Sequence, residues 1–135
     1  MIIMSVDYGN VRTGIAVCDK MQILASPVCV ITEKDREKLV VKISDLAKEK
    51  KAERICVGIP QNMDGTYGFR CDECKALGEM IEEKSNIPVV YQNERLTTVS
   101  AHNILNTADV RGKKRKEIVD AVSAVLILED YLKTL

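Results

Sequence analysis

The chain has 135 residues, the usual size of one domain, and its 46% hydrophobic content is enough for a single core. Twenty basic and twenty acidic residues give a formal net charge of +0, so any contact with nucleic acid must be local. No apolar run approaches the roughly 20 residues of a membrane span, and the N-terminus lacks a basic leader. We therefore expect a cytoplasmic, single-domain protein over residues 1–135, without a membrane segment.

The first third of the chain has the pattern of three strands. An apolar run over residues 2–7 ends at the turn signal Asp7-Tyr8-Gly9-Asn10, and a second run of strand character covers residues 13–18. A third strand is predicted over residues 24–31, before Thr32, which we expect to cap a helix. Apolar residues then recur at i, i+1, i+4, i+7 and i+8, which predicts one face of that helix: Leu39, Val40, Ile43, Leu46 and Ala47.

The middle of the chain alternates strands and helices. A buried strand is predicted over residues 54–58, followed by a loop over residues 60–68 with an Asp64-Gly65 turn. A second helix follows, with its core stripe at Cys71, Cys74, Leu77, Gly78 and Ile81. The fifth strand is predicted over residues 88–92.

Two further helices complete the predicted order. Thr97 caps a helix of about ten residues, residues 111–116 form a polar, basic break, and the last helix begins at about Glu117. The order β-β-β-α-β-α-β-α-α predicts an α/β fold in which a mixed five-stranded sheet carries helices on both faces.

Three acidic residues stand where a carboxylate is unexpected. Asp7 ends the first strand, Glu94 follows the fifth, and Asp120 lies in a helix that is apolar almost all round. An ionised carboxylate in such a helix costs several kcal/mol unless a cation or hydrogen bonds compensate it. If the first and fifth strands are parallel neighbours, Asp7 and Glu94 emerge at one edge of the sheet, and Asp120 reaches that edge from the covering helix.

Three converging carboxylates are suited to a hard divalent cation. They would hold one or two Mg²⁺ or Mn²⁺ ions, the arrangement that supports metal-assisted hydrolysis of a phosphodiester. Each acid also has an ordinary structural explanation. Asp7 could start an Asx turn, Glu94 could pair with Arg95 at the surface, and Asp120 could lie in a first helical turn stabilised by the macrodipole.

Basic residues near these acids are candidates for binding phosphate. Arg12, Arg70 and Arg95 are predicted at the rim of the site, where a guanidinium can grip phosphate oxygens in a bidentate way. A basic run is expected to attract the nucleic-acid backbone without reading its sequence. The alternative for this run is a solvated surface. It consists of Lys113, Lys114, Arg115 and Lys116.

The five cysteines are expected to be reduced. Most sit in apolar surroundings, where a free cysteine behaves as a small hydrophobic residue. Cys71 and Cys74 have the spacing of a redox or zinc half-site, but the two acids between them would raise the thiol pKa, so packing is favoured. The only histidine, His102, is predicted on a different helix and is expected to be a surface or structural residue.

Four blocks of sequence resemble the YqgF/RuvX family. They are Asp7-Tyr8-Gly9-x-x-Arg12-x-Gly14-x-Ala16, Val57-Gly58-Ile59-Pro60-x-Asn62-Met63-Asp64-Gly65, Glu94-Arg95-Leu96-Thr97-Thr98, and Asp120-Ala121-x-x-Ala124 with a Tyr131-Leu132 tail. The resemblance implies an RNase H-like fold and a nuclease that processes the 5′ end of pre-16S ribosomal RNA. It also implies an acidic site at Asp7, Glu94 and Asp120. This chain has Asn93 where members of the family often have an acid.

Other functions are compatible with parts of this pattern. A DNA endonuclease similar to Holliday-junction resolvases would use the same acids, and a catalytically silent nucleic-acid-binding or ribosome-associated module would keep the fold alone. The Asp7-x-Gly9 turn also resembles the phosphate loop of actin-like ATPases, but the chain lacks a second glycine-rich loop and a second domain. An RNA precursor is favoured over a DNA junction as partner, bound by a monomer or a homodimer.

Overall fold

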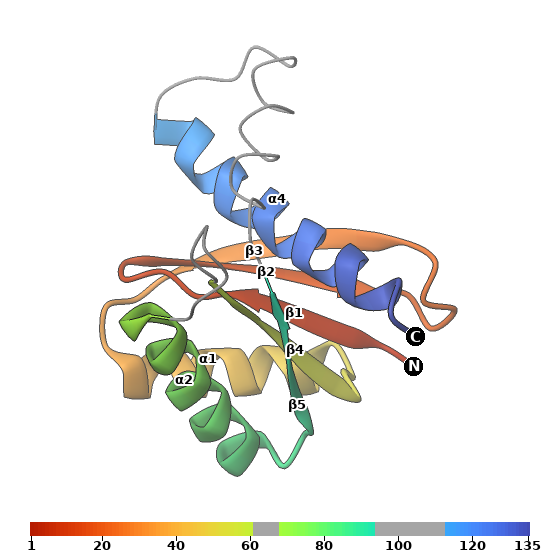
Figure 1. Ribbon diagram of the computed structural model, residues 1–135, viewed down its shortest axis with the longest axis horizontal. Helices are drawn as coiled ribbons and strands as arrows, with labels where there is room; N and C mark the ends of the chain where they lie inside the picture. Colours follow the sequence, from red (N-terminus) through yellow and green to blue (C-terminus); the bar gives the residue numbers. More distant parts are fainter. Residues whose placement is uncertain (61–67, 94–112) are drawn as a thin grey trace.

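The structure, a computed structural model, describes residues 1–60, 68–93 and 113–135 (Figure 1). The predicted Asp64-Gly65 turn and the helix capped by Thr97 lie outside these residues. The described elements are β1 (Ile3–Asp7), β2 (Arg12–Cys18), β3 (Ala25–Thr32), α1 (Arg36–Glu49), β4 (Arg54–Ile59), α2 (Phe69–Ser85), β5 (Val89–Asn93) and α4 (Lys113–Leu132).

The five strands form one mixed sheet in the order β3-β2-β1-β4-β5. The first three make an antiparallel meander, while β4 is parallel to β1 and β5 is parallel to β4. The expectation that the first and fifth strands are neighbours is wrong, because β4 lies between them. One edge of β1 is taken by β2, so the crossover through α1 places β4 on the other edge, and α2 carries the chain to β5 beyond it. The three parallel strands still end at the same edge.

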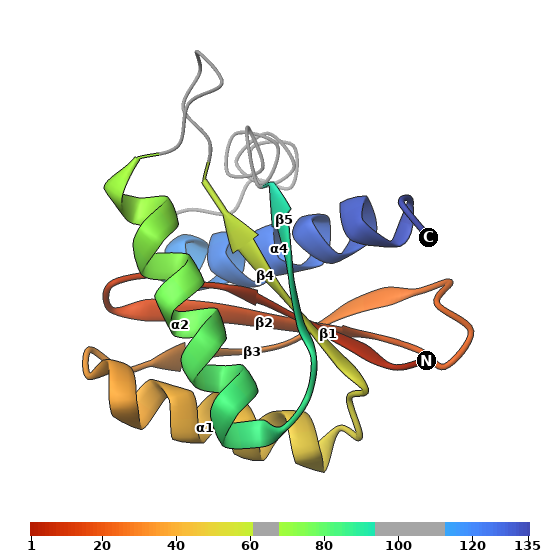
Figure 2. The same ribbon diagram turned by 60° about the horizontal axis from the view of Figure 1, so that its bottom comes forward.

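Helices cover both faces of this sheet, as predicted. The chain places α1 and α2 together on one face and α4 on the other (Figures 1 and 2). Side chains of the first layer include the fully buried Met4, Ile43 and Leu77, and those of the second include Ile3, Ile127 and Leu128. Burying one such side chain contributes about 1.5–3 kcal/mol, so the two layers stabilise the sheet from both sides.

The predicted core stripes are confirmed, but the cap of α1 is not Thr32. Thr32 is the last residue of β3, and the carboxylate of Asp35 accepts a hydrogen bond from the Lys38 amide at 3.2 Å. An acceptor at this position satisfies one of the free amides of the first helical turn. In α2, Cys71 and Cys74 are both buried against the sheet, as the packing interpretation required.

Helix α4 begins at Lys113, four residues before the predicted start at Glu117. The basic run is therefore helical rather than a break, because Lys and Arg are good helix formers. Along the helix Ala124, Ile127, Leu128 and Tyr131 are buried on the sheet, and the Ser5 hydroxyl donates a hydrogen bond to the Ala124 carbonyl at 2.6 Å. None of the helices described, α4 included, is long and apolar enough to cross a membrane.

Candidate active site

Asp7 ends the central strand β1 on the face that α4 covers. Side chains alternate along a strand, and Ser5, two residues earlier, bonds to α4. Asp7 therefore faces the same side, at the edge where β1, β4 and β5 all end. The alternation and the topology together account for a partly buried carboxylate at the carboxyl edge of the sheet.

Gly14 lies directly opposite Asp7 on β2, and α4 crosses the sheet at this point. A Cβ atom on Gly14 would overlap with the carbonyl oxygen of Asp120, so the absence of a side chain lets the helix come close. The approach places Asp120 against the residue that pairs with Asp7. Two of the three predicted acids are thus brought to one corner of the sheet from opposite ends of the chain.

Asp120 is held there by Arg12, the first residue of β2. The guanidinium Nε donates to Asp120 Oδ2 at 3.0 Å, with 34% of the arginine side chain and 25% of the aspartate side chain exposed. Burial raises the pKa of the Asp120 carboxyl, and the hydrogen bond and charge of Arg12 lower it, but the balance stays above the usual value. Arg12 therefore compensates only part of the cost of burying this charge.

The position of Asp120 in α4 excludes one of its structural explanations. Asp120 lies seven residues after Lys113, almost two turns into the helix. The effect of the helix dipole falls off within the first turn. The macrodipole therefore does not account for an acid at this place, whereas Arg12 accounts for part of it.

Arg70, predicted to bind phosphate, holds the turn that follows Asp7. Its guanidinium lies over the Tyr8 ring, 4.4 Å from the centroid, and donates hydrogen bonds to the Tyr8 carbonyl and, at 3.0 Å, to Asn10 Oδ1. Glu73 lies 3.6 Å from the same guanidinium. Sequence reasoning missed Tyr8 and Asn10 as partners of Arg70, because the residues are about 60 positions apart and follow no local spacing.

The remaining predicted site residues are less fully described. Glu94 and Arg95 lie outside the described residues, although β5 ends at Asn93, immediately before them. Of Lys113 to Lys116 the structure gives the helical backbone at the start of α4. Within the ranges that are described, no three His, Cys, Asp or Glu side chains are grouped closely enough to hold a metal ion.

The donors that are present fit a hard divalent cation. Carboxylate oxygens are the ligands that Mg²⁺ and Mn²⁺ prefer. A partly buried Asp120 that Arg12 compensates incompletely is a position where additional positive charge would be stabilising. Asp7 faces the same side of the sheet and supplies a second carboxylate of the same kind.

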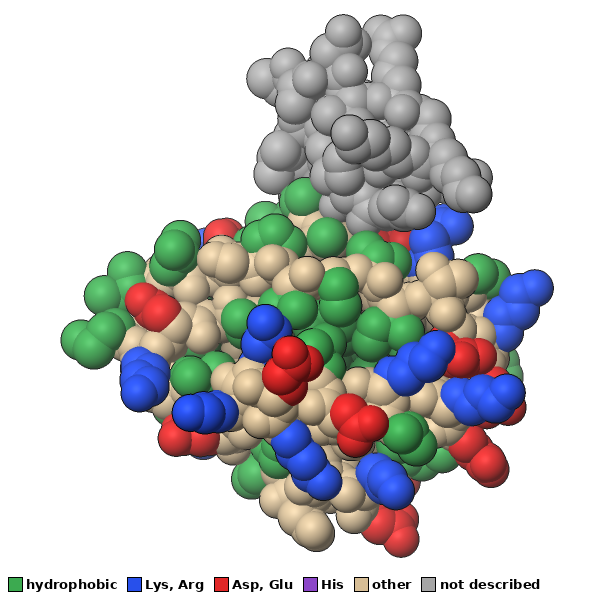
Figure 3. Space-filling model, turned by 180° about the vertical axis from the view of Figure 1, so that it is seen from behind, with side chains coloured by type: hydrophobic (Ala, Val, Ile, Leu, Met, Phe, Trp, Pro, Cys, Tyr) green, Lys and Arg blue, Asp and Glu red, His purple; other side chains and the backbone are tan. Residues whose placement is uncertain are grey.

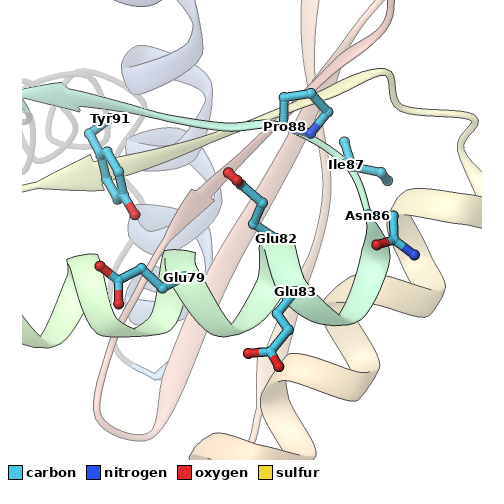
Figure 4. A pocket seen from close by; sticks show the side chains of 7 residues that line it. All are labelled: Glu79, Glu82, Glu83, Asn86, Ile87, Pro88 and Tyr91. Carbon is cyan, nitrogen blue, oxygen red and sulfur yellow. The ribbon is translucent and has the colours of Figure 1, made fainter.

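An acidic hollow of about 490 Å³ between α2 and β5 is separate from this corner (Figure 4). Tyr91, on its wall, packs against Gly78 of α2, so the hollow opens on the face of the sheet opposite to α4. One of its acids has a structural task, because Glu82 accepts a hydrogen bond from the Val89 amide at 2.9 Å. The hollow is lined by Glu79, Glu82, Glu83, Asn86, Ile87, Pro88 and Tyr91.

Charges of both signs are mixed on the surface seen in Figure 3. Lysine, arginine, aspartate and glutamate side chains are interspersed there, without one broad region of a single sign. The view agrees with the net charge of +0. A polyanion would accordingly be attracted by local groups rather than by the field of the whole molecule.

Comparison with known proteins defines the class of this chain. Solved structures that are similar to it over nearly its whole length include the following two. The complex of T. thermophilus RuvC with a Holliday junction substrate has a TM-score of 0.63 at 10% identity, with 99% of this chain and 94% of that chain covered. The complex of the fowlpox virus resolvase with Holliday junction DNA has a TM-score of 0.60 at 14% identity, with 99% and 98% covered. The fold is therefore the RNase H-like fold of these resolvases, as predicted.

Sequence comparison places the chain within that class. The family model described as "RuvX: Holliday junction resolvase" matches residues 1–134. A relative from Heliobacterium modesticaldum, named "Putative pre-16S rRNA nuclease", is 42% identical over 132 residues, which cover 98% of this chain and 89% of the relative. The chain belongs to the RuvX family, a family of nucleases related to Holliday junction resolvases, and the resemblance drawn from its four sequence blocks is confirmed.

Proposed function

We propose that residues 1–135 form a single nuclease domain that hydrolyses phosphodiester bonds of precursor 16S rRNA at its 5′ end. The observation that carries the proposal is the corner of the sheet shared by Asp7 and Asp120. Asp120 is partly buried there, and Arg12 compensates its charge only in part. Glu94, which directly follows β5, is the third carboxylate of the proposed site. The name of the Heliobacterium relative supports RNA as the substrate.

In this proposal Asp7, Glu94 and Asp120 hold one or two Mg²⁺ or Mn²⁺ ions. Bound there, the cations would activate water and stabilise the charge that develops on the leaving oxygen. Arg12, Arg95 and the basic start of α4, Lys113 to Lys116, bind phosphates on either side of the scissile bond. Arg70 acts on the substrate through the turn that it holds, because its guanidinium is positioned by hydrogen bonds to Tyr8 and Asn10.

A test of the proposal compares three labelled substrates with Mg²⁺, Mn²⁺ or EDTA: precursor 16S rRNA, a linear duplex and a four-way DNA junction. We expect cleavage of the RNA with either metal and none in EDTA. The variants Asp7→Asn, Glu94→Gln and Asp120→Asn should each lose nearly all turnover, since residues that act as a unit fail together. Glu79→Gln, an acid of the hollow on the opposite face, is the matched control and should cleave like the parent.

The same experiment identifies the alternatives. Cleavage of the junction but not of the RNA would favour a resolvase, which the description of the family model and the folds of RuvC and the fowlpox enzyme make the second candidate. Binding of RNA without cleavage under all conditions would indicate a silent module. A Glu94→Gln protein that retains more than a few per cent of the parent rate would remove Glu94 from the site.

We also propose that the protein works in the cytoplasm, in association with ribosomal particles, as a monomer or a homodimer. The five free cysteines support a reducing compartment. Sedimentation of the tagged protein with ribosomal precursors, and of the purified protein alone, would test the association and the oligomeric state.

A further inference from the structure

The ion pair between Arg12 and Asp120 joins two residues that have different partners in the proposed reaction. Asp120 would face a metal ion, and Arg12 would face a phosphate. In the structure they face each other, with Arg12 Nε 3.0 Å from Asp120 Oδ2. About a third of the arginine side chain is exposed, so Arg12 lies at the surface and is not enclosed by the core.

We propose that Arg12 is an exchangeable counterion, which neutralises Asp120 in the free protein and moves to a nucleic-acid phosphate when the site is loaded. The inference rests on the proposed function, and it gives Arg12 two alternative partners, Asp120 and a phosphate. A guanidinium bound to Asp120 repels a divalent cation at the same carboxylate, and it is unavailable to phosphate. Arg12 thus competes with metal for Asp120, and Asp120 competes with phosphate for Arg12.

Coupling between the two ligands follows from this competition. When a phosphate binds Arg12, Asp120 is left available to a metal ion. When a metal ion neutralises the Asp120 carboxylate, Arg12 is released and can bind phosphate. By linkage each ligand raises the affinity for the other by the same factor, commonly about 5- to 150-fold for coupled sites. The free protein would therefore bind metal weakly until a nucleic acid is present.

Calorimetric titration of the nucleic-acid-free protein with Mn²⁺ tests the first half of the exchange. Arg12→Gln and Arg12→Met remove the competing charge and keep an unbranched aliphatic stem, and we expect both to bind Mn²⁺ at least about fivefold more tightly than the parent. Arg12→Lys keeps the charge and should stay near the parent value. Arg36→Gln, which removes an arginine paired with Glu73 at 3.7 Å, is the matched control and should leave Mn²⁺ binding unchanged.

A double-mutant cycle in EDTA tests the second half. Asp120→Asn releases Arg12 and should tighten binding of a short RNA duplex. The same change made in the Arg12→Gln background should tighten it much less, because only the general loss of a negative charge remains. Equal gains in the two backgrounds would show that Arg12 does not move from Asp120 to phosphate.

The outcomes separate this inference from the proposed function. If Asp120→Asn, made in the Arg12→Gln background, leaves Mn²⁺ binding as it is in Arg12→Gln alone, Asp120 is not a metal ligand and the proposed site itself fails. If Asp120→Asn abolishes Mn²⁺ binding while Arg12→Gln and Arg12→Met bind no more tightly than the parent, the exchange is overturned and the nuclease assignment stands. Melting curves for each variant establish that the proteins compared are folded.

Discussion

Two opposing effects act on the carboxyl group of Asp120. Burial against the sheet favours the neutral acid, and Arg12 favours the charged form, with burial prevailing. An acid whose pKa is raised by folding binds more protons in the native state than in the unfolded state. The free energy of unfolding therefore falls as the pH rises from the unfolded pKa, about 3.9, through the raised native value. Above that window the ionised Asp120 is a cost to stability.

The first prediction concerns Asp120→Asn. In EDTA at pH 7 we expect this variant to melt at or above the parent temperature, with its advantage shrinking as the pH falls to about 4. Mg²⁺ or Mn²⁺ should raise the melting temperature of the parent but much less that of the variant, because a ligand stabilises only the protein that binds it. A variant that is clearly less stable in EDTA and shifts normally with metal would show that Asp120 is only a structural residue.

The second prediction concerns Gly14, where the sheet and α4 come closest. Gly14→Ala places a methyl group on the Asp120 carbonyl, which belongs to the helix backbone and cannot rotate away. Such overpacking typically costs about 1–3 kcal/mol, and here it should also displace Asp120 from Asp7. Urea denaturation and the Mn²⁺ titration would measure the two effects. Full stability with unchanged metal binding would contradict the close approach.

For helix α4, the sequence pattern predicts the buried face but not the residue at which the helix begins. Its buried stripe, which includes Ile127 and Leu128, and the acid within it could be predicted from periodicity and composition. Its start could not. Basic residues at 113–116 are equally compatible with a solvated loop and with a helix, and the pattern alone does not weigh one against the other.

The third prediction concerns this basic start of α4. Because the segment is helical, Lys113, Lys114, Arg115 and Lys116 are best replaced together by Gln, which preserves helix propensity. We expect weaker binding to RNA, duplex and junction alike, and a smaller dependence of log K on log salt concentration. A control with the same loss of charge replaces exposed lysines on the opposite face of the sheet: Lys38, Lys48, Lys50 and Lys84. An unchanged salt slope would mean that the run is a solvated surface.

The parts of the site that the sequence could not predict depend on contacts between residues that are far apart in the chain. The meander, the alternation and the carboxyl-edge position of Asp7 follow from local patterns. The pairs Arg12 with Asp120 and Arg70 with Tyr8 join residues 108 and 62 positions apart. A periodic sequence pattern is local and does not predict contacts over such separations. The position of β4 between β1 and β5 likewise depends on which edge of the sheet is open.

For the molecule as a whole, the fourth prediction tests how the core protects its thiols. All five cysteines are free; four are buried, and Cys29 is partly exposed. Burial raises the pKa of Cys56 to about 12 and also raises that of Cys29. An aromatic disulfide reagent at pH 8 should therefore label the native protein at Cys29 alone, slowly, and the unfolded protein at all five cysteines. Rapid native labelling of Cys71 or Cys74 would contradict the packing described.

The hydrogen bond between Ser5 and Ala124 spans 119 residues, and this separation bears on how the protein is made. A ribosome releases β1 to β5 before α4. Until α4 is synthesised, the side chains of the sheet that it covers stay exposed, among them Ile3, Ala16 and Cys56. Such a surface is prone to aggregation until the last helix closes it. Under the proposed function, the same delay withholds Asp120 from the acidic corner, so an unfinished chain cannot cut the RNA of the ribosome that is producing it.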